Sequence, residues 1–113
     1  MSKPVSIEIL YFDGCPNIDS ARDMVTDVIN QAGVDAQIVM IKVETNADAR
    51  EKHFIGSPSI RVEGKDVDTA GEENQQYSMR CRVYFSDEGM TALPPRGKLL
   101  KEIEHALEGA GHN

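Results

Sequence analysis

The stretch VSIEILYFDGCPNIDSARDMVTDVINQAG, residues 5–33, decides the fold. Residues 5–12 alternate between two faces and become apolar on both toward their end, which predicts a strand buried on both sides. Asp13 and Gly14 break this pattern, and apolar residues then recur at helical spacing over about 16–32. We therefore expect a strand, a tight turn and an amphipathic helix.

Shorter elements follow along the chain. Residues 36–43 are rich in β-branched and apolar side chains and predict a second strand, which is parallel to the first because a helix connects the two. A capping arrangement at Thr45 opens a short helix that reaches about residue 53. Residues 59–63 and 66–68 flank a tight turn and predict an antiparallel hairpin.

The last third of the chain has a weaker pattern. Residues 69–79 are polar and lack a period, which predicts a loop long enough to suggest a function. Alternation over 81–85 and the turn after it predict a second small hairpin, and an amphipathic helix follows the two prolines at 94–95. We expect one α/β domain over residues 1–113, with an inserted loop and hairpin at about 69–95.

Size and charge exclude several classes of protein. The chain has 113 residues, enough for a single core. Its formal net charge of −7 argues against nucleic acid as a partner, because phosphate binding needs clustered Lys and Arg. Its apolar runs are far shorter than a bilayer span, and its start lacks the apolar stretch of a secretory signal. We therefore expect a cytoplasmic protein with no membrane partner; the sequence leaves its oligomeric state open.

Cys15 and Cys81 are the two cysteines, too few for a disulfide framework, which favours redox or catalytic roles. Cys15 stands where the first helix is expected to begin, and we predict that it caps this helix. Backbone N–H groups and the helix dipole there favour thiolate, the reactive form, and lower a thiol pKa from about 8.5 to roughly 3.5–7.5. The alternative is a small buried hydrophobe, since free cysteine is often buried.

Two segments resemble the active site of the thioredoxin-like superfamily. YFDGCPNI at 11–18 is similar to its strand, turn, nucleophilic cysteine and helix start, and IGSPS at 55–59 is similar to the loop that carries its cis-proline. The resemblance implies a thioredoxin-like fold, Cys15 as the nucleophile and a cis Ser57–Pro58 peptide in contact with it. It also implies that substrate is bound by four residues near the sulfur: Pro16, Asn17, Ser57 and Pro58.

One departure from the superfamily restricts this chemistry. Ile18 stands where the second redox cysteine would fall, so Cys15 cannot form the usual short-loop disulfide. One-cysteine chemistry remains, in which Cys15 attacks a disulfide or another electrophile and a thiol of glutathione or of Cys81 resolves the adduct. Alternation also fits Cys81 to a strand core. The distance between Cys81 and Cys15 depends on which segment pairs with residues 59–63. The partner is either the strand that begins at Cys81 or residues 66–68.

The remaining candidates have simple structural interpretations. Asp13 lies two residues before the sulfur and is a conceivable proton acceptor, although Asp-Gly is also common turn chemistry. The three histidines have no ligand spacing to each other or to a cysteine, so no metal site is expected: His53, His105 and His112.

These residues predict thiol-dependent redox or thiol-transfer chemistry without a bound cofactor, with glutathione as a co-substrate or a protein thiol or disulfide as the partner. One alternative rests on GCP at 14–16 and CRVY at 81–84, which are similar to stretches of proteins labelled alkylmercury lyases. That resemblance implies soft-metal chemistry by Cys15 and Cys81, with Asp13 as the acid. The other alternative is a non-catalytic binding or adaptor module, which fits the missing second cysteine.

Overall fold

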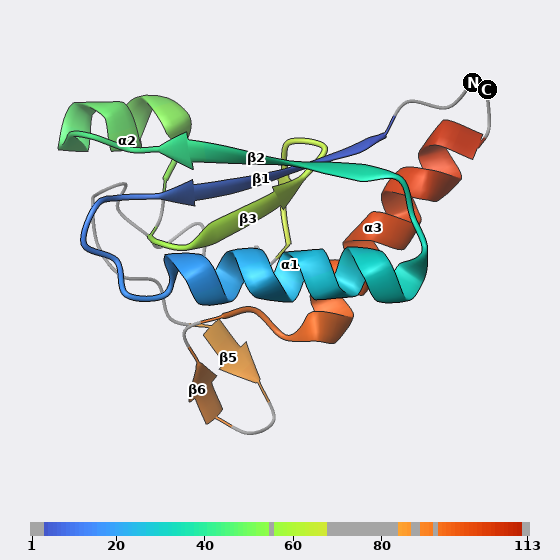
Figure 1. Ribbon diagram of the computed structural model, residues 1–113. Coiled ribbons are helices and arrows are strands. Elements are labelled where there is room, and N and C mark those ends of the chain that lie inside the picture. Colours follow the sequence, from blue (N-terminus) through green and yellow to red (C-terminus); the bar gives the residue numbers. More distant parts are fainter. Residues whose placement is uncertain (1–3, 55, 68–83, 87–88, 92, 112–113) are drawn as a thin grey trace.

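A small α/β domain with a mixed four-stranded sheet and three helices is seen in the computed structural model, which describes residues 4–54, 56–67, 84–86, 89–91 and 93–111 (Figure 1). The strands of the sheet are β1 (Val5–Tyr11), β2 (Ala36–Lys42), β3 (Ser59–Val62) and β4 (Lys65–Asp66). The helices are α1 (Ile18–Ala32), α2 (Asn46–Lys52) and α3 (Arg96–Gly111). A separate two-stranded sheet consists of β5 (Tyr84–Ser86) and β6 (Gly89–Thr91).

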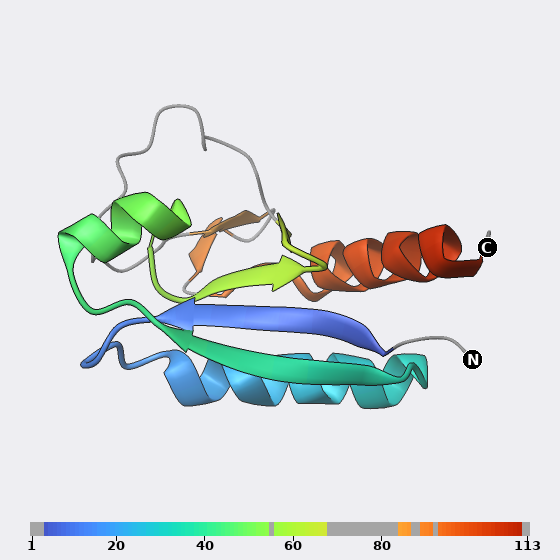
Figure 2. The ribbon, with the colours of Figure 1, turned by 90° about the horizontal axis from the view of Figure 1, so that it is seen from above.

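The central strand β1 organises the sheet, whose order is β2-β1-β3-β4 (Figure 2). β1 runs parallel to β2 and antiparallel to β3, and β3 pairs antiparallel with β4. The predicted strand–helix–strand unit and the first hairpin are therefore confirmed. Among the described residues the partners of β3 are β1 and β4, while β5 pairs with β6 as the predicted second hairpin.

The larger core lies between the sheet and the two long helices. α1 and α3 pack on the same face, below the sheet in Figure 1. The periodicity of β1 explains this face, because Ile7 and Ile9 project toward the helices and are fully buried. The other core residues come from both long helices and from the hairpin segment: Ala21, Val25, Val28, Ile60, Val62, Val67, Leu99 and Ile103.

A smaller core lies on the opposite face, where α2 covers one end of the sheet (Figure 1). It consists of Leu10, Val43, Ala49 and Phe54. Ile9 and Leu10 are thus buried on opposite faces of β1, which confirms the prediction that this strand becomes buried on both sides. No helix within the described part of the chain has the length and apolar character needed to cross a membrane.

Reciprocal capping holds the start of α2, as the sequence predicts. The side chain of Thr45 accepts a hydrogen bond from the Asp48 N–H at 3.0 Å, and Asp48 Oδ2 accepts one from the Glu44 N–H at 3.1 Å. Asp48 also forms an ion pair with Lys52, one helical turn on. The bond from Lys52, followed by that from the Glu44 N–H, holds the pKa of Asp48 below its ordinary value of 3.8.

We predict that Asp48→Asn destabilises the chain in a pH-dependent way. A carboxylate whose pKa is lowered in the folded state stabilises that state above the unfolded pKa and loses this effect as the pH falls through the folded pKa. The variant should therefore have a lower melting temperature than the wild type at about pH 7, and the difference should be smaller at about pH 3. Thermal melts at both pH values test this, with exposed Asp23→Asn on α1 as the control. An equal loss at both pH values would contradict it.

Candidate functional site

The register of β1 and β3 brings the two candidate segments to one end of the sheet. Leu10, near the end of β1, pairs with Ser59, the first residue of β3. Because the strands are antiparallel, the chain leaves β1 at the same edge where it enters β3 (Figure 1). The turn at 12–15, here called the Cys15 turn, therefore lies at the same edge as residues 56–59, here called the cis-proline loop.

The Cys15 turn is a tight reversal of the backbone. The Cys15 N–H donates to the carbonyl oxygen of Phe12 at 3.3 Å, and Gly14 has a φ of 93°, a conformation that favours glycine. Cys15 itself is buried, with 6% of its surface exposed. The two substrate-contact candidates that follow it differ, because Pro16 is exposed and Asn17 is half-buried.

The prediction that Cys15 caps the first helix is wrong. The N-cap of α1 is Asn17, whose side chain makes no capping hydrogen bond, and the helix begins at Ile18. The first helical hydrogen bond runs from the Ala21 N–H to the Asn17 carbonyl at 3.0 Å. Pro16 and Asn17 form a turn of their own that redirects the chain after the Cys15 turn. The sulfur-bearing residue therefore precedes the N-cap by two positions.

The cis-proline loop is buried along its described length. The Ser57–Pro58 peptide is cis, as the resemblance implies. Gly56, with a φ of 145°, takes a conformation that favours glycine, and its carbonyl accepts a hydrogen bond of 2.5 Å from the Ser59 hydroxyl. The Ser57 hydroxyl is fully buried and has no hydrogen-bond partner among the described residues. Buried hydroxyls are usually bonded, so Ser57 is unusual in this loop.

Tyr84 fixes this loop from a distant part of the sequence. Its hydroxyl donates to the Pro58 carbonyl oxygen at 2.6 Å, and the residue is 1% exposed. The contact attaches β5 to the cis-proline loop across 26 positions of sequence. The sequence pattern assigns no role to Tyr84. Its position in an alternating strand could have suggested one, because a tyrosine buried in a strand needs a hydrogen-bond partner for its hydroxyl.

An ion pair connects the Cys15 turn to the end of β2. Lys42 Nζ lies 2.7 Å from Asp13 Oδ2 and 4.0 Å from a carboxylate oxygen of Glu44. The hydrogen bond to Asp13, together with the negative charge of Asp13, raises the pKa of Lys42 above 10.5. Asp13 is therefore more than a turn residue. It lies two positions before Cys15, and Lys42 compensates its negative charge there.

Cys81 and the histidines are the remaining candidates of the sequence analysis, and the structure does not place any of them in this site. Cys81 and the polar loop at 69–79 lie outside the described residues, so the distance from Cys15 to Cys81 stays a prediction. His53 is the C-cap of α2 with a φ of 54°, and His105 lies in α3. In the described part of the chain, no three His, Cys, Asp or Glu side chains form a group that could hold a metal ion.

Comparison with known proteins adds no assignment to this geometry. No protein-family model, curated protein or solved structure matches the chain significantly.

We predict that Tyr84→Phe destabilises the chain by about 1–2 kcal/mol, because it leaves the buried Pro58 carbonyl without its donor. Urea denaturation of the wild type and the variant measures the change. Tyr11→Phe is the matched control, since the half-buried Tyr11 makes no hydrogen bond through its hydroxyl to any described residue. Equal effects of the two substitutions would contradict a specific role for the Tyr84 hydroxyl.

We also predict that the Asp13–Lys42 pair controls the charge that a reagent meets at Cys15. Lys42→Met leaves Asp13 uncompensated, so anionic iodoacetate should react more slowly relative to neutral iodoacetamide, by about twofold for one exposed charge within a Debye length. Asp13→Asn should change the ratio in the opposite direction. Lys101→Met, an exposed lysine of α3, is the control. Ratios that are the same in all four proteins would contradict the prediction.

Proposed function

We propose that this chain is a thioredoxin-like protein that uses Cys15 as the nucleophile of thiol-dependent redox or thiol-transfer chemistry. The observation that carries the proposal is the convergence of the Cys15 turn and the cis-proline loop at one edge of the sheet, fixed by the pairing of Leu10 with Ser59. These are the two segments on which the resemblance to the superfamily rests, and 41 positions of sequence separate Cys15 from Gly56, the first residue of the cis-proline loop.

The arrangement of elements supports the thioredoxin-like part of the proposal. A strand–helix–strand unit is followed by a β-hairpin and a closing helix, which is the order that the resemblance implies, and the short helix α2 lies between the unit and the hairpin. The two long helices share one face of the sheet, and the cis peptide immediately precedes β3. The separate β5–β6 hairpin is an addition to this order.

The proposed reaction has two exchange steps. The thiolate of Cys15 attacks one sulfur of a disulfide, so that a mixed disulfide with Cys15 forms and the other sulfur leaves as a thiolate. A second thiolate then attacks the mixed disulfide, forms a new disulfide with the substrate sulfur and releases Cys15 as thiolate. Because Ile18 replaces the usual second cysteine, the second thiolate comes from glutathione or another external thiol, or from Cys81.

Burial of Cys15 bears on the size of the substrate. With 6% of the residue exposed, access to the sulfur is narrow. A small flexible disulfide such as glutathione disulfide meets this restriction more easily than a disulfide on the surface of a folded protein. We therefore take glutathione as the first substrate to test.

We predict that glutathione disulfide modifies Cys15 of the folded chain. Mass spectrometry should find one glutathione on Cys15 in the wild type and in Cys81→Ser, and none at that position in Cys15→Ser. The same chain unfolded in urea is the control for the intrinsic reactivity of both thiols. Addition of reduced glutathione should remove the adduct and regenerate the free thiol.

Other outcomes of the same experiment identify the alternatives. A folded chain whose two thiols are both inert, while the unfolded chain reacts, would contradict the proposal and support a non-catalytic binding module. Tight binding of a mercury compound that requires both Cys15 and Cys81 would instead support the soft-metal alternative.

A further inference from the structure

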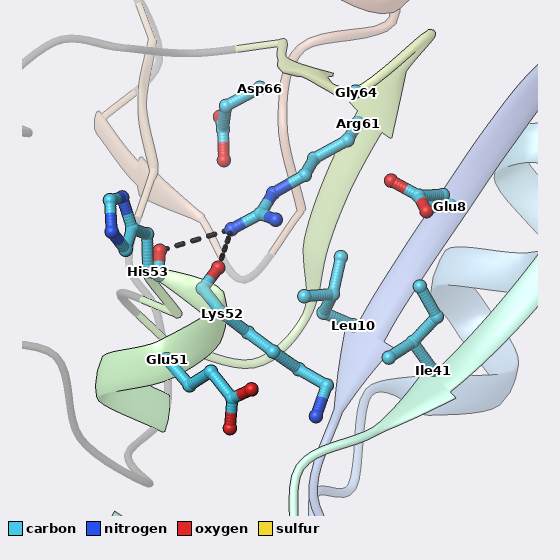
Figure 3. A pocket seen from close by; sticks show the side chains of 9 residues that line it. All are labelled: Glu8, Leu10, Ile41, Glu51, Lys52, His53, Arg61, Gly64 and Asp66. Carbon is cyan, nitrogen blue, oxygen red and sulfur yellow. Dashed lines mark hydrogen bonds between the residues drawn. The ribbon is translucent and has the colours of Figure 1, made fainter. Parts of the chain in front are cut away.

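A groove on the α2 face of the sheet lies apart from the candidate site. It has a volume of about 450 Å³ and is bounded by β1, β2, the end of α2 and the β3–β4 hairpin (Figure 3). Cys15 and the cis-proline loop do not contribute to its lining. The volume falls within the range of sites for small molecules. Leu10 and Ile41 form an apolar floor, and charged side chains surround it.

Arg61 is held in place at one side of this groove. One terminal nitrogen, Nη2, donates to the carbonyl oxygens of Lys52 at 2.7 Å and His53 at 3.0 Å. These carbonyls belong to the C-terminal end of α2, where a positive charge is favourable. The guanidinium is therefore fixed before any ligand arrives. Its other nitrogens make no hydrogen bond to the described residues, so they are available as donors.

Glu8 faces Arg61 from the neighbouring strand. The two residues are direct partners in the antiparallel register of β1 and β3, a position at which opposite charges usually attract each other. Within the described part of the chain, however, they form no ion pair, and the Glu8 carboxylate has no polar partner. Figure 3 shows the two groups on opposite sides of the groove. α2 holds the guanidinium away from the carboxylate that lies across from it.

We propose that this groove binds a free α-amino acid with an apolar side chain. The α-carboxylate accepts hydrogen bonds from the unused nitrogens of Arg61, and the α-ammonium donates to Glu8. The side chain of the amino acid covers the half-buried Ile41, beside the buried Leu10. A ligand of this kind bridges a fixed cation and an unpaired carboxylate that do not meet each other.

Ligands with a single kind of charge fit the groove less well. A phosphate or a simple carboxylate that approaches Arg61 would also approach the carboxylates of Glu8, Glu51 and Asp66, whose negative charges repel it. A simple amine would meet these carboxylates but would leave the unused nitrogens of Arg61 without an acceptor, while the charge of Lys52 is already compensated by Asp48. A zwitterion provides a partner for both Glu8 and Arg61. It should therefore bind more tightly than a molecule that carries only the carboxylate or only the ammonium group.

The test is a titration of the full chain with L-leucine, in which two-dimensional NMR spectra of the backbone amides are recorded at each ligand concentration. We expect saturable binding with a Kd of roughly 1 mM or below, and shifts of the amide signals of Glu8, Arg61 and Gly64. L-leucinamide, which lacks the carboxylate, and 4-methylpentanoate, which lacks the ammonium, should each bind about tenfold more weakly or worse.

Glu8→Gln is the decisive variant, because the Glu8 carboxylate makes no hydrogen bond within the described chain and its replacement should leave the fold unchanged. It should weaken L-leucine binding about tenfold or more, whereas Glu104→Gln, on the exposed side of α3, should bind as the wild type does. Arg61→Gln should also weaken binding, with its amide spectrum as the control for folding. Absence of saturable binding, equal binding of leucinamide, or an unaffected Glu8→Gln would each overturn the proposal.

Discussion

The pairing of β1 on both of its edges is the constraint on which the rest of the structure depends. β1 is parallel to β2 on one side and antiparallel to β3 on the other. The register with β3 determines two separate places in the molecule. Leu10 opposite Ser59 sets the edge where the Cys15 turn and the cis-proline loop lie, and Glu8 opposite Arg61 sets the charged groove.

The same strand explains why the two faces of the sheet differ. Side chains alternate along β1, so Ile7 and Ile9 enter the large core under α1 and α3 while Glu8 and Leu10 face the α2 side. α2 has seven residues and covers only one end of that face, where Leu10 is buried. A shift of the register by one residue would bring Glu8 to the large core, and the energetic cost of burying an unpaired carboxylate opposes such a shift.

Much of the fold could be predicted from the sequence, because it depends on local periodicity. The alternation in 5–12, the helical spacing before Gly33 and the cap at Thr45 each identify an element, and the cis Ser57–Pro58 peptide followed from a resemblance. The start of α1 was misplaced because a proline at position 16 can equally open a helix or occupy a turn. The contacts of Tyr84 and Arg61 could not be predicted, since side-chain bonds to distant carbonyls leave no periodic pattern.

The proposed chemistry requires that the Cys15 turn and the cis-proline loop form one site. Nuclear Overhauser effects between the β-protons of Cys15 and the ring protons of Pro58 test it most directly, in the full chain with both thiols reduced. The account predicts clear effects between these protons, because the pairing of Leu10 with Ser59 brings both segments to one edge. Absence of these effects, with Cys15 instead showing effects only to side chains of the α1–α3 core such as Val25 or Leu99, would contradict the claim.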